Sequence, residues 1–258
     1  MRMKGALALL VFLFFACRAE HDVIVAGSTS VQPYAEVLAE EYMVINPKNG
    51  VDIQGGGSSA GITAAESGTA HIGMSSRALK DSEKHLWSIE IAKDGLAMIV
   101  NPRNPVENLS LAQIRAIYAE DIKNWSELGG ANHRIHIIAR EEGSGTRSAF
   151  EELIMADRYI TPRAIIQNSN GAVKQLVADD PSSIGFISLG LVDPTVKALR
   201  LDGVEATREN ILNGSYSLLR SFIFVSKEKP EEAAMDYINF VLSEHGQSLL
   251  TDEGLIPE

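Results

Sequence analysis

Four short turns rich in glycine, serine and threonine are the segments of this sequence best suited to hold a negatively charged ligand. Each lies between a predicted strand and a predicted helix, so it can offer backbone N–H groups and a helix dipole to an anion. Glycine lets the backbone approach a ligand closely, and a short hydroxyl both donates and accepts hydrogen bonds. Capping alone explains one serine at a helix start, but four such turns at the carboxyl ends of strands predict an anion site. The turns are residues 27–30, 57–59, 75–77 and 143–146.

One arginine stands close enough to the fourth turn to join it in binding an anion. Arg140 precedes Ser144 by four residues, and its guanidinium can bind two oxygens of a tetrahedral oxyanion, which a lysine ammonium cannot do. Glu141 and Glu142 follow directly. One of these carboxylates can hold Arg140 in place or accept a proton from a protonated anion. An ordinary surface ion pair is the alternative.

Other motifs give an enzyme or a metal site less support. Residues 57–61 match the G-x-S-x-G pattern of a serine hydrolase, with Ser59 as nucleophile and His245 far enough downstream to be its base. His133 and His136 differ by three positions, which on a strand points them to opposite faces and disfavours a shared metal. No G-x-x-x-x-G-K-[ST] motif is present, so a P-loop has no support. We expect a binding protein without cofactor or metal, not an enzyme.

The elements that must position these turns alternate between strand and helix, which predicts an α/β fold. Residues 22–26 form a nearly continuous apolar run, typical of a strand buried on both faces of a parallel sheet. A helix follows, with apolar residues from Tyr34 to Ile45 at helical spacing. The cycle then repeats, with strands predicted at 51–54 and 71–74 and a helix between them that ends near residue 67.

A second lobe is expected after the proline-rich passage 101–105, which we interpret as a link. Ser110 can cap a helix that runs through Tyr118. The later strands are predicted at 135–139, 183–187, 196–201 and 219–225, and the later helices from residue 144 and over 231–242. Because the last strand and helix are expected to return to the first lobe, lobe I comprises 22–100 plus 220–258 and lobe II comprises 101–219.

The first and fourth turns resemble each other within this one sequence. Gly-Ser-Thr-Ser at 27–30 is echoed by Gly-Ser-Gly-Thr at 143–146, and the helical residues that follow match at the same offset of 116. We interpret the pair as one strand–turn–helix device used once in each lobe. Two unrelated helices with Gly-Ser starts are the alternative.

Composition and charge exclude several classes of protein. With 258 residues, 45% of them hydrophobic, the chain can form one large or two medium domains with substantial cores. Its 34 acidic and 23 basic residues give a formal charge of −11, which argues against nucleic acid as a partner and against a basic membrane-surface role. A single cysteine excludes a disulfide framework and a thiolate zinc cluster. An anion must therefore be held by local dipoles.

The first seventeen residues are typical of an export signal. An uncharged run over residues 5–16 follows two cationic residues and stops at Cys17, and it is too short to span a bilayer, which takes about 20 residues. Cys17 resembles the acceptor of a bacterial lipoprotein signal, although Phe14 and Phe15 stand where that family usually has Leu and a small residue. An ordinary secretory signal cut slightly later is the alternative. Either way we expect an exported chain, with a charge of −13 once Arg2 and Lys4 are removed.

Taken together, the four turns resemble those of the phosphate-binding proteins of bacterial ABC-type phosphate uptake. The matching segments are Gly-Ser-Thr-Ser at 27–30, Gly-Gly-Gly-Ser-Ser-Ala-Gly at 55–61, Ile-Gly-Met-Ser-Ser-Arg at 72–77 and Gly-Ser-Gly-Thr-Arg at 143–147. Stretches within 117–130 and 240–257 also match. The resemblance covers nearly the whole mature chain. It implies a two-lobe periplasmic-binding-protein-like fold of type II, with the ligand cleft between the lobes.

The resemblance also implies the ligand, the partner and the site. It predicts a monomer that binds inorganic phosphate outside the cytoplasmic membrane and delivers it to the membrane subunits of an ABC permease. The protein would be attached to the membrane only through its lipid, or would be periplasmic. Carried over by motif, the phosphate-binding residues are Thr29, Ser30, Ser58, Ser76, Arg140, Ser144, Gly145 and Thr146.

One departure from the family concerns selectivity. Some members have an aspartate where this chain has Ser76, and there it accepts the phosphate proton and helps reject sulfate. Selectivity here is expected to rest on Glu142 or another acceptor, or to be weaker. Binding of a different tetrahedral oxyanion, sulfate or molybdate, is therefore the main alternative, and a serine hydrolase using Ser59 is a more distant one.

Overall fold

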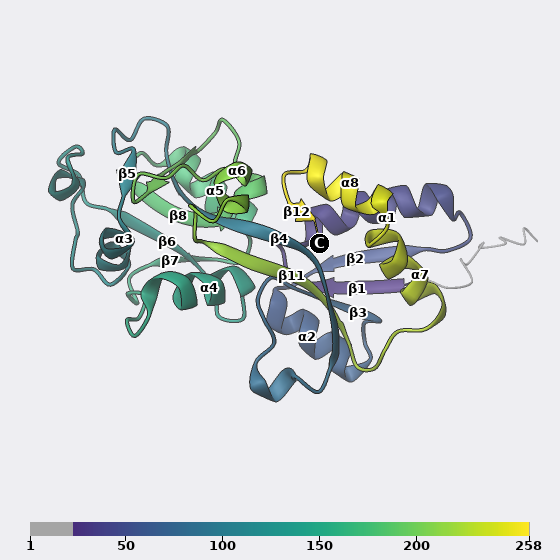
Figure 1. The fold of residues 1–258 in the computed structure, drawn as a ribbon. Helices are drawn as coiled ribbons and strands as arrows, with labels where there is room; N and C mark the ends of the chain where they lie inside the picture. Colours follow the sequence, from purple (N-terminus) through teal and green to yellow (C-terminus); the bar gives the residue numbers. More distant parts are fainter. Residues whose placement is uncertain (1–22, 258) are drawn as a thin grey trace, which may run out of the picture.

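The computed structural model describes residues 23–257, in which one curled, mixed sheet runs through two lobes with helices on both faces (Figure 1). The expected α/β alternation is confirmed. The predicted signal at residues 1–17, with Cys17, lies outside the described residues. The first part of the chain forms β1 (Val23–Gly27), α1 (Gln32–Ile45), β2 (Val51–Gly55), α2 (Ser58–Ser67), β3 (Ile72–Ser75), η1 (Asp81–Glu83) and β4 (Trp87–Val100).

The first three strands end at one edge of the sheet. β1 lies between β2 and β3 and is parallel to both. Parallel strands leave their carboxyl ends together, so the loops that follow them start side by side. This arrangement brings the first three Gly/Ser turns to one edge of the first lobe.

The second lobe repeats the parallel arrangement around β6. This strand lies between β8 and β7 and is parallel to both, so the fourth turn and the start of α5 follow neighbouring carboxyl ends. The elements are β5 (Asn108–Leu109), α3 (Leu111–Tyr118), η2 (Trp125–Leu128), β6 (His136–Arg140), α4 (Gly145–Phe150), η3 (Glu151–Met155), β7 (Ile165–Gln167), α5 (Asn170–Asp179), β8 (Ser183–Ser188), η4 (Leu189–Leu191), β9 (Lys197–Ala198), β10 (Arg200–Leu201) and α6 (Arg208–Leu212).

Two long antiparallel strands carry the chain between the lobes (Figure 1). Residues 87–95 of β4 pair with β11 beside the first lobe, whereas residues 96–100 pair with β8 in the second. The passage 101–105 is therefore not the link that the sequence suggested. It folds against the second lobe, where the Asn101 amide donates to the Ala178 carbonyl at 2.6 Å. The lobe limits at residues 100 and 219 remain a prediction.

After β11 the chain returns to the first lobe. The remaining elements are β11 (Leu219–Ser226), α7 (Glu232–Val241), α8 (Glu244–Asp252) and β12 (Ile256–Pro257). Of these, α7 corresponds to the helix expected over 231–242, and α8 is a helix that the sequence did not predict. Tyr237 of α7 packs against Tyr42 of α1 with ring centroids 5.4 Å apart, and its hydroxyl donates to the Ala35 carbonyl. These contacts hold α7 against the helix that follows the first turn.

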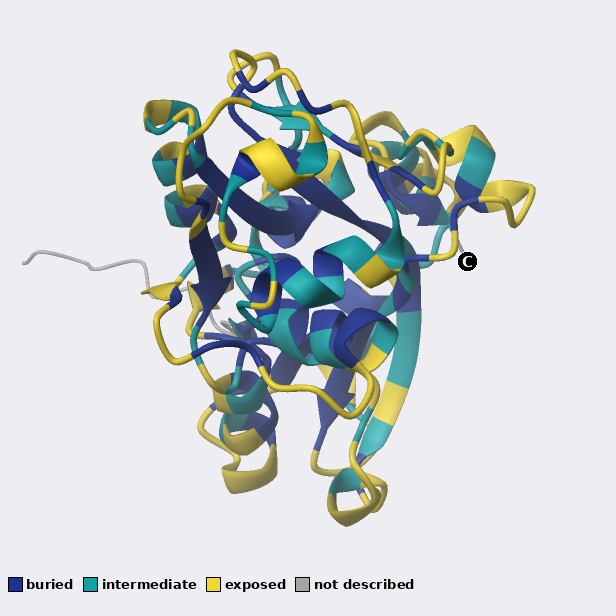
Figure 2. Ribbon diagram, turned by 90° about the vertical axis from the view of Figure 1, so that its left-hand side faces the viewer, coloured by how far each residue is buried: buried dark blue, intermediate teal, exposed yellow. Residues whose placement is uncertain are grey.

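Each lobe has its own hydrophobic core, and buried residues concentrate in the strands and the inner helix faces (Figure 2). The core of the first lobe gathers around Tyr34, Leu38 and Phe224, and that of the second around Phe150 and Phe186, whose rings stack 4.1 Å apart. Helices α5 and α2 cover the opposite faces with smaller clusters. Between residues 23 and 257, no helix has both the length and the apolar character needed to cross a bilayer.

Two predicted elements differ from the structure in detail. The strand expected at 196–201 divides into β9 and β10, because the chain changes partners: the Leu199 N–H donates to Met98, and the next N–H donates to Glu107. The helix expected from residue 144 is α-helical only through Phe150 and continues as the π-helix η3. By contrast, Ser110 caps α3 as predicted, accepting from the Gln113 N–H at 3.1 Å.

Candidate functional site

The repeated turns of the two lobes meet where the lobes are in contact. The Ser30 and Thr146 hydroxyls lie 2.7 Å apart and share a hydrogen bond, and each residue is 1% exposed. They occupy equivalent places in the internal echo, separated by the offset of 116 residues. The structure therefore brings together the two copies of the strand–turn–helix device that the sequence predicted.

The second and third turns join the first through a chain of hydroxyls. The Ser28 hydroxyl donates to the Ser76 hydroxyl at 2.9 Å, and the Ser58 and Ser76 hydroxyls are 3.3 Å apart. The Ser76 N–H donates to the Ser58 oxygen at 3.1 Å. All three side chains are buried. A hydroxyl exchanges donor and acceptor roles easily, so these three hydroxyls can turn their protons toward an oxyanion.

Gly145 allows the second lobe to approach these hydroxyls closely. A Cβ at this position would stand 2.3 Å from the Ser58 oxygen and 2.5 Å from the Ser76 oxygen, closer than any side chain permits. The Ser59 N–H of the first lobe also donates to the Gly143 carbonyl of the second at 3.0 Å. Ser144 accepts from the Arg147 N–H at 3.3 Å and so caps α4. The lobes are thus in direct contact at the predicted residues.

Arg140 extends from the end of β6 into the first turn. It is 1% exposed, and its Nη2 donates to the Thr29 hydroxyl at 3.0 Å, which is a further hydrogen bond between the lobes. Its Nε and Nη2 also donate to the Glu141 carboxylate at 2.9 and 3.0 Å. A fork of two parallel hydrogen bonds fixes the plane of a guanidinium.

The sequence left two carboxylates as candidates to orient Arg140, and in the structure Glu141 does so and Glu142 does not. Glu142 is exposed and lines an open groove beside Lys80 and Arg147. Residues next to each other on a turn point in different directions, and only the backbone path decides which of two adjacent carboxylates faces the guanidinium.

Four buried side-chain polar atoms have no hydrogen-bond partner within residues 23–257, among them Nε of Arg77 and Nη1 of Arg220. The other two belong to residues that meet between the lobes. They are Nη1 of Arg140, a donor, and Oδ1 of Asn170, an acceptor. Buried polar atoms in folded proteins nearly always have a partner, so these two mark where a bound group belongs. Sequence reasoning missed Asn170 and also Ser28. The available signal was the Asn-Ser-Asn-Gly segment at 168–171, a polar turn before a helix like the other four.

Arg77, from the third turn, braces the outer side of the site. It binds the Glu83 carboxylate at 2.7 and 2.9 Å, and its Nη2 donates to the Ser59 hydroxyl at 3.3 Å. The hydrogen bond from Arg77 lowers the pKa of Glu83. Ser59 is thus held by an arginine and not by a histidine. His245 instead pairs with Glu41 on the surface of the first lobe, so the structure gives no support to a hydrolase triad.

A buried ion pair lies on the two strands that cross between the lobes. Arg220 of β11 donates to the Asp94 carboxylate of β4 at 2.8 and 3.0 Å, and the Ser188 hydroxyl donates to the same carboxylate at 2.8 Å. Burial raises the pKa of Asp94 and lowers that of Arg220, although each partner opposes the shift of the other. The positive charge of Arg140 also contributes to the lowered pKa of Arg220.

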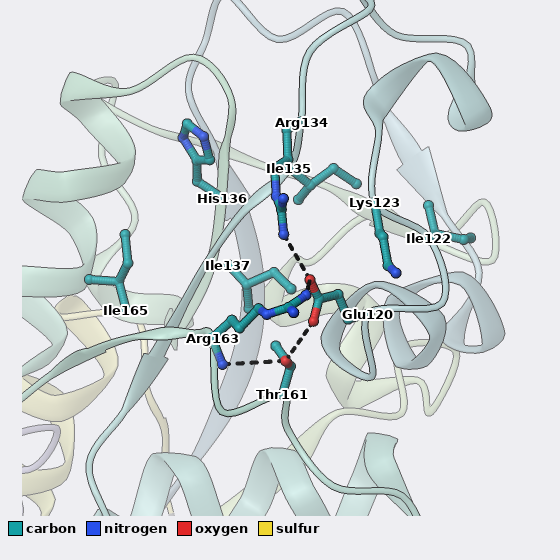
Figure 3. A pocket seen from close by; sticks show the side chains of 10 residues that line it. All are labelled: Glu120, Ile122, Lys123, Arg134, Ile135, His136, Ile137, Thr161, Arg163 and Ile165. Atoms are coloured by element: carbon teal, nitrogen blue, oxygen red, sulfur yellow. Dashed lines mark hydrogen bonds and ion pairs between the residues drawn. The ribbon is translucent and has the colours of Figure 1, made fainter.

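A separate hollow in the second lobe contains none of the predicted site residues. In it, Arg134 and Arg163 both reach the Glu120 carboxylate at 2.8 Å, and the Thr161 hydroxyl donates to it at 3.0 Å (Figure 3). These cations are thus already paired within the protein. In the described part of the chain, no three histidine, cysteine, aspartate or glutamate side chains gather as a metal site would require.

Comparison with known proteins places this chain in a family. The model of the PBP superfamily domain matches residues 18–245. The phosphate-binding protein PstS of Bacillus subtilis is 32% identical over 246 residues, covering 93% of this chain and 82% of its own. PstS of Borreliella burgdorferi is 28% identical, covering 95% of this chain and 94% of its own.

Solved structures agree with these relatives. One from Clostridium perfringens, described as a phosphate ABC transporter substrate-binding protein with bound phosphate, is 44% identical with a TM-score of 0.90, covering 92% of this chain and all of that one. An ABC-type phosphate transport receptor from Vibrio cholerae is 38% identical with a TM-score of 0.76 and the same coverage. These similarities confirm the expected two-lobe fold. The chain belongs to the PBP superfamily and, within it, to the family of the phosphate-binding protein PstS.

Proposed function

We propose that this protein binds inorganic phosphate between its two lobes and serves an ABC transporter for phosphate. The observation that carries the proposal is the convergence of buried donors from both lobes around Arg140, whose Nη1 has no partner among residues 23–257. The PstS relatives, and the C. perfringens structure with its bound phosphate, support the same ligand.

The chemistry of the cluster suits a small tetrahedral oxyanion. Its members are one guanidinium, short hydroxyls and the starts of α2, α4 and α5, where backbone N–H groups and the helix dipole favour negative charge. The proposed phosphate-binding residues are Thr29, Ser30, Ser58, Ser76, Arg140, Ser144, Gly145 and Thr146, together with Ser28 and Asn170, which the structure adds.

The setting of this function is a further part of the proposal. We infer that the chain is exported, acts as a monomer outside the cytoplasmic membrane, is held there through Cys17, and passes phosphate to permease subunits without catalysing a reaction. The segment at residues 1–17 and the PstS relatives support this inference.

Calorimetric titration of the purified mature chain tests the proposal. Phosphate is expected to bind one site per chain, and sulfate and molybdate much more weakly. Because Ser59 touches Arg77 and is not in the hydroxyl chain, Ser59→Ala should keep phosphate binding, whereas Ser58→Ala should weaken it. Tighter binding of sulfate or molybdate than of phosphate contradicts the proposal. Ester turnover that Ser59→Ala abolishes contradicts the non-catalytic role.

A further inference from the structure

We propose that Asn170 gives the site its selectivity for a protonated oxyanion: its Oδ1 accepts a hydrogen bond from the P–OH group of hydrogen phosphate. This inference rests on the proposed phosphate site and assigns a specificity role within it. Sulfate has no proton to donate near neutral pH, so it cannot make this hydrogen bond. No proton is transferred, because the amide acts only as an acceptor.

The structure holds Asn170 firmly in position. It is the first residue of α5, and the helix start is fixed by Ser169, whose hydroxyl accepts from the Ala172 N–H at 3.1 Å. The side chain is 1% exposed. Its Nδ2 donates to the Ser30 hydroxyl at 2.7 Å, and Ser30 in turn shares its hydrogen bond with Thr146. The amide therefore lies at the junction of the two lobes, in contact with the proposed phosphate residues.

The hydrogen bond to Ser30 determines what the other end of the amide can do. An amide group is planar, with donors on nitrogen and an acceptor on oxygen. Because Nδ2 is used by Ser30, the remaining end is Oδ1, which has no donor among residues 23–257 although it is buried. A protonated oxyanion is a ligand that carries the missing donor.

The other acceptor-only groups beside Arg140 each already accept a hydrogen bond. Both Glu141 oxygens accept from Arg140, as do the backbone carbonyls of Gln167 and Asn168. The hydroxyls of the cluster can donate as well as accept, so they can pair with a sulfate oxygen as readily as with a P–OH group and do not distinguish the two anions. Oδ1 of Asn170 is the acceptor that does, because a fully ionised oxyanion would place lone pairs against it and leave it unpaired.

Monofluorophosphate provides the sharpest probe. At pH 8 it has the charge of hydrogen phosphate and nearly its shape, but fluorine replaces the P–OH group. Titrations of both anions, and of sulfate, into the wild-type chain and Asn170→Leu test the inference. Leucine keeps the volume of the amide and removes its acceptor. Asn213→Leu, an exposed asparagine of the second lobe, is the matched control.

We expect the wild-type chain and the control to bind phosphate at least about tenfold more tightly than monofluorophosphate or sulfate. Asn170→Leu should bring this preference to within about threefold, by weakening phosphate binding more than binding of the other two anions. Asn170→Asp keeps an acceptor and should keep the preference, and it is the informative variant if the leucine variant does not fold.

Three results overturn the inference alone: a wild-type chain that binds phosphate without preferring it to monofluorophosphate, an equal weakening of all three anions in Asn170→Leu, or a lost preference in folded Asn170→Asp. An equal weakening would mean that the amide only positions Ser30. A wild-type chain that binds no phosphate would instead overturn the proposed function, and the inference with it.

Discussion

Replacing Arg140 by alanine should weaken phosphate binding more than any other single truncation in the site. The guanidinium is 1% exposed, so solvent screens its charge poorly, and its Nη1 is the buried donor left for the ligand. A charge-assisted hydrogen bond contributes about 1.5–3 kcal/mol, and loss of one member of a buried charge pair costs about 2–5 kcal/mol. The dissociation constant should therefore rise by roughly 30-fold to a few thousandfold.

Part of that loss would come from Glu141, which Arg140 neutralises. In Arg140→Ala this carboxylate keeps its charge without its partner, and it repels the incoming anion. The double variant with Glu141→Gln removes the repulsion, so it should recover part of the affinity but not all of it. Arg158→Ala, which breaks a half-exposed pair with Asp121, is the matched control and should bind as the wild type does.

Isothermal titration calorimetry at several temperatures measures these effects, with thermal melting of each ligand-free variant to confirm its fold. A folded Arg140→Ala variant whose dissociation constant stays within threefold of the wild type would refute the reasoning. Full recovery in the double variant would mean that the arginine serves only to neutralise its neighbour.

Three other perturbations test the surrounding structure. Gly145→Ala adds a methyl group where the lobes meet and should weaken phosphate binding by about 1–3 kcal/mol in titrations, while melting of the ligand-free chain changes little. Asp94→Asn leaves Arg220 as a buried charge without a counter-charge and should cost about 3–5 kcal/mol in urea unfolding, much of it recovered when Arg220 is also replaced by methionine. The pKa of Glu83 is lowered by Arg77, so the stabilisation from this pair is present above the ordinary glutamate pKa and is lost as the pH falls through the lowered value. The difference in melting temperature between the wild type and Glu83→Gln should therefore shrink below about pH 4. A difference that does not change with pH would contradict this prediction.

The fold and the four turns could be predicted because their signals are local. Apolar runs of strand length, helical spacing after them and Gly/Ser turns between them determine an α/β order that needs no knowledge of distant contacts. The offset of 116 residues between the turns at 27–30 and 143–146 even predicted a structural equivalence. In the structure the equivalent residues Ser30 and Thr146 are joined by a hydrogen bond.

What the sequence could not predict depends on direction in space. Glu141 and Glu142 are chemically identical neighbours, and only the backbone path after β6 turns the first of them toward Arg140. Asn170 belongs to a turn whose strand, β7, has only three residues, too short for a periodic signal. The prediction that residues 101–105 link the lobes was wrong for a related reason. Prolines indicate a break in regular structure, but β4 continues through the crossing because its two ends pair with different strands.

The site also explains how a strongly acidic protein can hold an anion. Glu141 neutralises the charge of Arg140, so the pair contributes an oriented hydrogen-bond donor to the site but little net positive charge. The donors beyond Arg140 are neutral groups: hydroxyls that turn their protons inward and N–H groups at helix starts, which keep their orientation when solvent is excluded. Such groups need partners from both lobes at short range, as in the contact between Ser30 and Thr146. We therefore expect the lobes to close as the anion binds, because neither lobe alone supplies enough donors to replace the water around an oxyanion.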